Sequence, residues 1–309
     1  MITVLGSLHM DLITRTDRIP RLGETVWGGQ FIMSPGGKGM NQAVAAARLG
    51  SEVEFVGSMG DDHFGSILRD RLRKERITII HLKIGSEPTG VASIMVDSNG
   101  NNIIAVAPGA DKALTLEELE QIDDLMERSN IFMAQLEVPD ELVIKGLEKA
   151  CEAEVKTVLN LAPARELPPH TLNMVDVLVL NDLEAKDLAE SDSVERSAQK
   201  VIEQGPRAVV VTLGKEGSML IWEGEVITIP GIEVKAVDTT GAGDAFCGGL
   251  AAALDAGQTL EKAVRLGNLA GALSTTKLGA QEALPTRAEI EKLEKELEFK
   301  NRSHTVKDL

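Results

Sequence analysis

The sequence predicts an α/β fold, a three-layer sandwich in which a central, mostly parallel β-sheet lies between helices. The first observation is a series of short runs rich in Val, Ile and Leu: Ile2–Gly6, Val53–Ser58, Ile131–Gln135, Val155–Leu159, Val175–Leu180 and Ala208–Leu213. The second is that helical patterns fall between them: Asn41–Leu49, Phe64–Glu75, Thr115–Met126, Glu141–Ala153, Leu183–Glu190 and Val194–Gln204. Continuous apolar strands that alternate with helices are typical of a parallel sheet covered on both faces.

Two segments break this alternation and predict a second, smaller β-sheet. Residues 12–33 and 77–106 are turn-rich, alternate between apolar and polar residues, and lack a helical pattern. We expect them to form a lid embedded in a single domain of residues 1–299. The last third of the chain is expected to be helical, and residues 300–309 to form a frayed tail. The expected helices are Ala245–Ala256, Leu260–Thr275 and Thr286–Glu296, the last with a capping box of Thr286 and Glu289.

Composition limits the possible functions. Hydrophobic residues make up 43% of the 309 residues and aromatic ones only 3%, which predicts a large aliphatic core. The net charge of −16 argues against binding to nucleic acid or to an anionic membrane. No apolar run approaches the roughly 20 residues of a spanning helix. Cys151 and Cys247 are isolated, which indicates reduced thiols and a cytoplasmic location.

The segment from Asp238 to Phe246, with the sequence DTTGAGDAF, lies between a β-rich stretch (Val226–Val237) and an alanine-rich helical run. Small residues at a helix start leave backbone N–H groups free to bind an anion. Because a helix N-terminus favours negative charge, we expect Asp244 to stay ionised with no raised pKa. Such a weak base suffices for phosphoryl transfer, where positioning dominates. A Gly-rich turn whose aspartate merely caps the helix explains the segment equally well.

Four further segments lie at predicted strand ends or helix starts, and each also has a purely structural explanation. Asp11 follows the first strand, and Lys38 and Asn41 follow a glycine turn; both places suit sugar hydroxyls but also ordinary turns. Asn181 and Glu184 suit water-mediated Mg²⁺ binding, although N-x-x-E is also a helix-capping pattern. The segment 212–217 permits close approach of a phosphate or is a simple hairpin turn. Neither G-x-x-x-x-G-K-[ST] nor a complete G-x-G-x-x-G occurs.

The order of these motifs resembles that of the ribokinase family of carbohydrate kinases over residues 2–296. The resemblance rests most specifically on Gly36-Gly-Lys-Gly39 and on Asp238-Thr-Thr-Gly-Ala-Gly-Asp244 at this separation. The supporting segments are Gly6-Ser7 with Asp11, Asn41-Gln42-Ala43, Ser58 to Asp62, Gln135 to Glu137, Ala162 to Pro168, Asn181 with Glu184, Thr212 to Gly214, and Gly279 to Gln281.

The resemblance implies an ATP-dependent kinase that phosphorylates the 5-hydroxyl of D-ribose and works with Mg²⁺ and K⁺. It implies that Asp244 is the base and that Gly241, Ala242 and Gly243 form the anion hole. The implied residues fall into three further sets. The sugar would contact His9, Asp11, Gly37, Lys38, Asn41 and Glu137. The nucleotide and Mg²⁺ would contact Asn181, Glu184, Thr212, Gly214, Gly217, Gly243 and Asn268. Potassium would lie near Asp238, Thr240, Ser274, Lys277 and Gly279.

Three departures from the family pattern affect specificity. His9 and Met10 replace an asparagine and a small residue in the first sugar motif, which is expected to shift substrate preference. Ala283 replaces a serine at the potassium site, and Asn268 a histidine near adenine. Alternatives are a kinase for 2-deoxyribose, a nucleoside or another small sugar, and a non-catalytic sugar- or nucleotide-binding protein. We also expect a homodimer that forms through the edges of the β lid.

Overall fold

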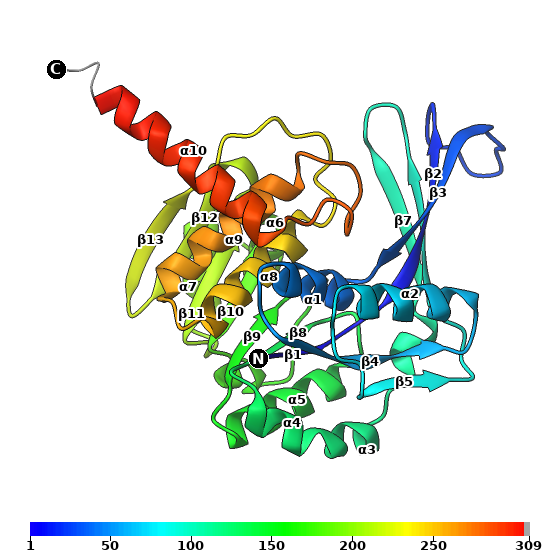
Figure 1. Cartoon of the computed structure of the whole chain (residues 1–309), viewed down its shortest axis with the longest axis horizontal. Coiled ribbons are helices and arrows are strands. Elements are labelled where there is room, and N and C mark those ends of the chain that lie inside the picture. Colours follow the sequence, from blue (N-terminus) through cyan, green and yellow to red (C-terminus); the bar gives the residue numbers. More distant parts are fainter. Residues whose placement is uncertain (306–309) are drawn as a thin grey trace.

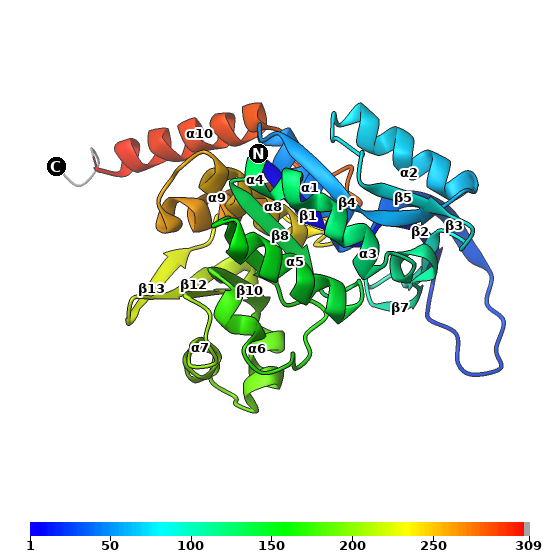
Figure 2. The ribbon, with the colours of Figure 1, turned by 90° about the horizontal axis from the view of Figure 1, so that it is seen from below.

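The computed structural model describes residues 1–305, with side chains up to residue 299, and this part of the chain forms two β-sheets (Figure 1 and Figure 2). The large sheet has the strand order β13-β12-β11-β10-β9-β8-β1-β4-β5. The seven strands β11, β10, β9, β8, β1, β4 and β5 pair with one another in parallel, whereas β12 and β13 pair antiparallel to their neighbours. The bounds are β1 (Ile2–Leu5), β4 (Val53–Gly60), β5 (Leu82–Gly85), β8 (Ile131–Gln135), β9 (Lys156–Asn160), β10 (Val177–Asn181), β11 (Ala208–Thr212), β12 (Gly217–Trp222) and β13 (Glu225–Pro230).

Helices cover both faces of this sheet and enclose two separate cores. One core is formed with α1 (Lys38–Arg48), α2 (His63–Lys74), α8 (Ala242–Asp255), α9 (Leu260–Ser274) and α10 (Arg287–Thr305). The other is formed with α3 (Leu116–Leu119), α4 (Asp123–Arg128), α5 (Asp140–Glu152), α6 (Asp182–Ala189) and α7 (Val194–Ile202). Successive side chains of a strand point to opposite faces: Ile131 and Met133 of β8 enter the first core, and Phe132 and Ala134 enter the second. Both faces are therefore buried, which explains the uninterrupted apolar strands and confirms the predicted fold class.

The small sheet has the order β3-β2-β6-β7 and projects from the body at the side opposite α10 (Figure 1). Its strands are β2 (His9–Thr16), β3 (Gly28–Gly36), β6 (Gly90–Val96) and β7 (Asn102–Ala107). β2 pairs with β6 in parallel, and the two outer pairings are antiparallel. The expected lid segment 77–106 is wrong in one respect: β5 belongs to the large sheet, where it extends the parallel order beside β4.

Three expected boundaries also differ. The expected helix Thr115–Met126 is split by a 3₁₀ turn, which places Leu119 and Ile122 on one side and allows both to be buried. The expected β stretch up to Val237 ends with β13 at Pro230. Helix α10 runs to Thr305, so part of the expected frayed tail is helical, while residues 306–309 lie outside the described part. None of the described helices has the length and apolar character of a membrane span.

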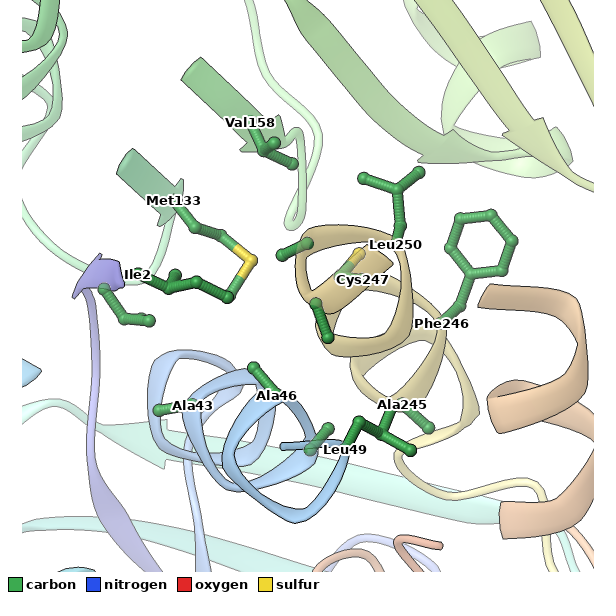
Figure 3. Close-up of a cluster of buried hydrophobic side chains, with 14 of the residues drawn as sticks. Ile2, Ala43, Ala46, Leu49, Met133, Val158, Ala245, Phe246, Cys247 and Leu250 are labelled. Atoms are coloured by element: carbon green, nitrogen blue, oxygen red, sulfur yellow. The ribbon is translucent and has the colours of Figure 1, made fainter. Parts of the chain in front are cut away.

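Small residues bring α1, α8 and α9 close together beneath the large sheet (Figure 3). A Cβ added at Gly248 of α8 would lie 2.4 Å from the Cβ of Ala45 in α1, and one at Gly249 would lie 3.0 Å from the Cβ of Ala270 in α9. Larger residues at these positions would push the helices apart. This close packing presses the first turn of α8, which carries Asp244, against the first turn of α1.

Candidate active site

The carboxyl ends of β1 and β8 meet at the point where the strand order reverses, since the chain places β4 on one side of β1 and β8 on the other. Open α/β sheets bind ligands at this position. Glu137 follows β8, and its Oε2 accepts hydrogen bonds from Ser7 Oγ at 2.5 Å and from the amide of Lys38 at 2.9 Å. Gly37 caps α1 and packs against the backbone of Ser7. The glycine turn is thereby fixed against the ends of both central strands.

Asp244 lies in the first turn of α8 and is only 7% exposed. Its Oδ2 accepts a hydrogen bond from Asn41 Nδ2 at 2.9 Å, and its Oδ1 accepts one from Gln42 Nε2 at 3.0 Å. Burial raises the pKa of Asp244, and the charge of Glu137 acts in the same direction, against Lys38 and the two amides. The expectation that the helix N-terminus alone would prevent a raised pKa is therefore wrong, because α1 closes over the carboxylate and removes it from water.

The start of α8 has the geometry of an anion-binding turn. Gly241 caps the helix at φ 76°, a left-handed conformation that favours glycine. Within the described chain, the amides of Gly241 and Gly243 make no hydrogen bond, whereas that of Ala242 donates to Thr239 O at 3.2 Å. Two of the three expected amides are therefore available to an anion, and the third stabilises the turn.

A cavity of about 130 Å³ opens in front of this turn. It is lined by residues from the ends of three strands (β9, β10 and β11) and the starts of three helices (α1, α6 and α8), among them Lys38, Asn181, Glu184, Gly243 and Asp244. Burial opposes the charge of Lys38, but the carboxylates of Asp244, Glu137 and Glu184 outweigh it and raise the pKa of this lysine. The cavity thus combines a fixed positive charge, free amides and a buried carboxylate, which together suit a transferring phosphoryl group.

Asn181 and Glu184 form the capping box of α6, so the structural explanation of this motif is confirmed. Asn181 Oδ1 accepts from the amide of Glu184 at 2.8 Å, and the amide of Asn181 donates to Glu184 Oε2 at 2.8 Å. The other oxygen, Oε1, makes no such contact with the described residues. Burial raises the pKa of Glu184, against the hydrogen bond to Asn181 and the charge of Lys38. Capping therefore uses only half of the carboxylate and leaves an oxygen at the cavity.

A second cluster surrounds His9, at the start of β2. Its Nε2 lies 3.5 Å from Asp11 Oδ1, and its Nδ1 lies 3.5 Å from Asp111 Oδ2. Nδ1 is buried and has no hydrogen bond of good geometry in the described chain. Burial opposes a charge on His9, but the contact with Asp111 and the charges of Glu137, Asp111 and Asp11 outweigh it and raise the histidine pKa. Burial also raises the pKa of Asp11 and of Asp111 to about 6, against the charge of His9.

The remaining expected nucleotide residues lie at two places. Thr212 ends β11 and lines the cavity with Glu184, while Gly214 and Gly217 bound the turn into β12. Asn268 lies elsewhere: it is buried in α9 and donates to Ser218 Oγ at 3.0 Å and Ile229 O at 3.3 Å. Its amide joins α9 to β12 and β13, and it does not line the cavity.

The expected potassium residues gather on the far side of the α8 turn. Asp238 accepts hydrogen bonds from Thr240 Oγ1 at 2.7 Å and from the amide of Gly279 at 3.0 Å. Ser274 Oγ donates to Gly271 O, and Lys277 Nζ pairs with Glu289 at 2.6 Å, so both side chains are engaged elsewhere. Main-chain carbonyls and the Asp238 carboxylate are the groups left for a monovalent cation.

Sequence reasoning gave no role to Gln42, Gln135, Asn160 or Asp111, which the structure brings to the two carboxylate clusters. Gln42 and Gln135 were visible only as parts of the segments Asn41-Gln42-Ala43 and Gln135 to Glu137, and Asn160 lay one residue beyond the expected strand Val155–Leu159. Asp111 lies in a short 3₁₀ turn (Gly109–Lys112) after β7 and is 2% exposed. Asp111 belongs to none of the motifs or expected elements of the sequence analysis.

Comparison with known proteins agrees with this geometry. The family model described as "pfkB family carbohydrate kinase" matches residues 1–287. A ribokinase of Haemophilus influenzae is 36% identical over 294 residues (93% of this chain, 96% of that protein), and a deoxyribokinase of Salmonella typhi is 34% identical over 292 residues (92% and 95%). The structure of Arabidopsis thaliana ribokinase complexed with ribose and ATP superimposes with a TM-score of 0.88 at 30% identity, covering 94% of this chain and 97% of that one. The chain belongs to the pfkB family of carbohydrate kinases.

Proposed function

We propose that the protein transfers the γ-phosphoryl group of ATP to the 5-hydroxyl of D-ribose, giving ribose 5-phosphate and ADP. The observation that carries this proposal is the buried Asp244 carboxylate, held by two amides beside an anion-binding helix start and the charge of Lys38. The relatives reported above, among them a ribokinase solved with ribose and ATP, support the choice of substrates.

In this reaction Asp244 accepts the proton of the sugar's 5-hydroxyl while that oxygen forms a bond to the γ-phosphorus. The bond between the γ-phosphorus and the oxygen bridging to ADP breaks, and ADP leaves with that oxygen. The amides of Gly241 and Gly243 and the ammonium of Lys38 stabilise the charge on the phosphoryl oxygens. The raised pKa of Asp244 suits this role, because a stronger base accepts the proton more readily.

The sugar contacts follow from the second cluster. The 3.5 Å separation of His9 Nε2 and Asp11 Oδ1 is long for a direct hydrogen bond. A secondary hydroxyl of the sugar bound beside them accepts from the imidazole and donates to the carboxylate. Gly37, Asn41 and Glu137 complete the site through the glycine turn. This arrangement favours ribose over a sugar that lacks the hydroxyl, and a 2-deoxyribose kinase is the competing assignment.

Nucleotide and magnesium would bind at the opposite end of the cavity. Thr212 lines the cavity, and the open space beside Gly214 leaves room for the nucleotide at the turn between β11 and β12, whereas Gly217 packs against the backbone of Pro230 and Gly231. Asn181 and Glu184 would adjoin the phosphates. The unpaired Oε1 of Glu184 fits a magnesium ion held through water, and the ion would neutralise phosphate charge. Adenine recognition by Asn268 has no support, because the amide of Asn268 is bonded within the core.

A kinase assay tests the proposal. Purified protein is incubated with Mg-ATP and ribose, 2-deoxyribose, other pentoses, hexoses or nucleosides, and ADP and the phosphorylated sugar are both quantified. We expect ribose to give the highest kcat/KM and ribose 5-phosphate as the product. ADP formation no faster with ribose than without sugar would contradict the proposal, and binding of ribose without product would indicate a non-catalytic protein.

We infer a cytoplasmic location from the need for ATP.

We further propose that a second copy of the chain covers the lid. In the strand register, Ile13 pairs with Ile32 and Ile94, and Ile94 with Ile104, so four isoleucines form a row on the same face as Asp11. Ile104 is 56% exposed in the single chain. Such a row, in line with the sugar site, fits a self-complementary contact that shields both sites from water.

Sedimentation at several protein concentrations tests this dimer. Ile104→Glu is expected to shift the protein to monomer, because it places a charge in the isoleucine row. Ile103→Glu is the matched control, since Ile103 is equally large, 51% exposed and on the opposite face of β7. A monomeric wild type, or equal effects of both substitutions, would contradict the proposed interface.

A further inference from the structure

The side-chain amide of Gln42 contacts the base and is itself fully engaged in hydrogen bonds. Gln42 Nε2 donates to Asp244 Oδ1 at 3.0 Å and to Asn160 Oδ1 at 3.0 Å, and Gln42 Oε1 accepts from Gln135 Nε2 at 2.7 Å. Gln42 and Gln135 are completely buried, and Asn160 is nearly so. Both N–H donors of the Gln42 amide and its oxygen are therefore in use, and water does not compete for them.

A main-chain carbonyl sets the direction of this network. Asn160 Nδ2 donates to Val179 O at 3.2 Å. A carbonyl oxygen only accepts hydrogen bonds, so Asn160 must turn its NH₂ toward β10 and its oxygen toward Gln42. Gln42 must then present its own NH₂ to Asn160, and the second hydrogen of that NH₂ points at Asp244. The oxygen of Gln42 is held away from Asp244 by the donor of Gln135.

This direction has a consequence for the carboxylate. Both oxygens of Asp244 accept from amides, one from Gln42 and one from Asn41. Hydrogen bonds donated to an ionised carboxylate favour the ionised form, whereas burial and a neighbouring negative charge disfavour it. Burial and Glu137 act against ionisation of Asp244, so the donated hydrogen bonds are needed to keep it available as a base.

We propose that Gln42 is a positioning residue that holds Asp244 deprotonated and correctly oriented, and that Asn160 and Gln135 hold Gln42 in its donating orientation. The inference rests on the proposed role of Asp244 and does not depend on which sugar is phosphorylated. It predicts that changes at Gln42 alter the protonation of the base more than the binding of either substrate.

The test compares Gln42→Leu, Gln42→Glu and Gln135→Leu by steady-state kinetics from pH 5 to 9. Gln42→Leu removes the donor, so kcat is expected to fall by about tenfold to a hundredfold, with the acid limb of the pH profile moved to higher pH. Gln42→Glu keeps the shape of the side chain and places a second carboxylate beside the first, so the limb moves further. Gln135 contacts Gln42 but not Asp244, so Gln135→Leu should move the acid limb of the pH profile in the same direction by a smaller amount.

Thr157→Val is the matched control, since Thr157 is fully buried and its Oγ1 donates to Met174 O at 2.7 Å, away from the cavity. Its acid limb should coincide with that of the wild type. Folded Gln42 variants, verified by circular dichroism, that retain wild-type kcat and acid limb would overturn the inference. An Asp244→Asn variant distinguishes failure of the Gln42 role from failure of the proposed base. If Asp244→Asn loses turnover while the Gln42 variants are unaffected, only the role of Gln42 is rejected. If Asp244→Asn retains turnover, the assignment of Asp244 as the base is rejected as well.

Discussion

The two buried carboxylate clusters differ in the groups that hold them. Asp244 is held by the side-chain amides of Asn41 and Gln42, which do not titrate, and the direction of the Gln42 amide is fixed by its neighbours. Asp11 and Asp111 flank an imidazole at 3.5 Å on either side, so their charges depend on each other and on pH. We propose from this difference a division of roles: the first cluster would hold the base for the reaction, and the second, which contains His9, would determine which sugar fits.

The largest expected effect is that of Asp244→Asn on turnover. The substitution keeps the shape of the side chain but removes the proton acceptor, so kcat should fall by about 10²–10⁴-fold. Steady-state kinetics with ribose and ATP measure the loss, and calorimetry should still detect sugar binding. A folded variant with near-wild-type kcat would eliminate Asp244 as the base.

His9→Leu should change selectivity and leave the reaction intact. The substitution removes the imidazole that donates a hydrogen bond to the sugar and that neighbours Asp11 and Asp111. Loss of this hydrogen bond should weaken sugar binding by about 1–3 kcal/mol. The ratio of kcat/KM for ribose to that for 2-deoxyribose should therefore fall by roughly tenfold to a hundredfold. An unchanged ratio would remove His9 from the determination of specificity.

The pH dependence of sugar binding is the next effect. The pKa values of Asp11 and Asp111 are raised to about 6, and an aspartate is protonated below its pKa, so KM for ribose should rise as the pH falls below about 6. The raised pKa of His9 also predicts that ribose affinity declines at alkaline pH, as the imidazole loses its positive charge. Asp111→Asn removes a negative charge beside His9 and lowers the histidine pKa, so this alkaline decline should begin at a lower pH. Glu54→Gln is the control, because Glu54 is a buried carboxylate paired with His81 outside the site. A ribose KM that stays constant from pH 8 to 5 would be incompatible with these raised pKa values.

The smallest expected effect concerns the potassium ion proposed from the family resemblance. Asp238 and main-chain carbonyls near Gly279 would be its ligands, whereas Ala283 supplies no side-chain oxygen, so we expect activation by potassium of only a few-fold over tetramethylammonium. Assays in matched chloride salts measure it. Equal rates in potassium, sodium and tetramethylammonium would show that the departure at Ala283 has abolished the effect.

The sequence predicted the fold because the fold depends on local patterns, and the candidate reaction centre was chosen from local patterns as well. The strands read as apolar runs since both faces are buried, and the DTTGAGD segment combines the anion-binding turn with Asp244. The partners of these groups come from distant segments, as the separation of 202 positions between Gln42 and Asp244 illustrates. The raised pKa of Asp244 was missed for the same reason, because helix position alone does not reveal that α1 covers the carboxylate.

Asp111 shows the limit most clearly. It is 103 positions from Leu8, whose amide donates to its Oδ1 at 2.8 Å, and it reaches His9 only because β6 and β7 return the chain to the start of β2. Asn268 shows the converse case: the resemblance implied a position near adenine, and its side chain is bonded within the core. Contacts between distant segments decide both cases, and no single stretch of sequence contains them.

Parallel kinetics of Gln42→Leu and His9→Leu with ribose and 2-deoxyribose test the division of roles most directly. We expect Gln42→Leu to lower kcat for both sugars by the same factor and to leave their kcat/KM ratio unchanged. We expect His9→Leu to change that ratio while kcat for ribose stays close to that of the wild type. A changed ratio in Gln42→Leu, or an equal loss of kcat for both sugars in His9→Leu, would contradict the separation of the reaction from the choice of sugar.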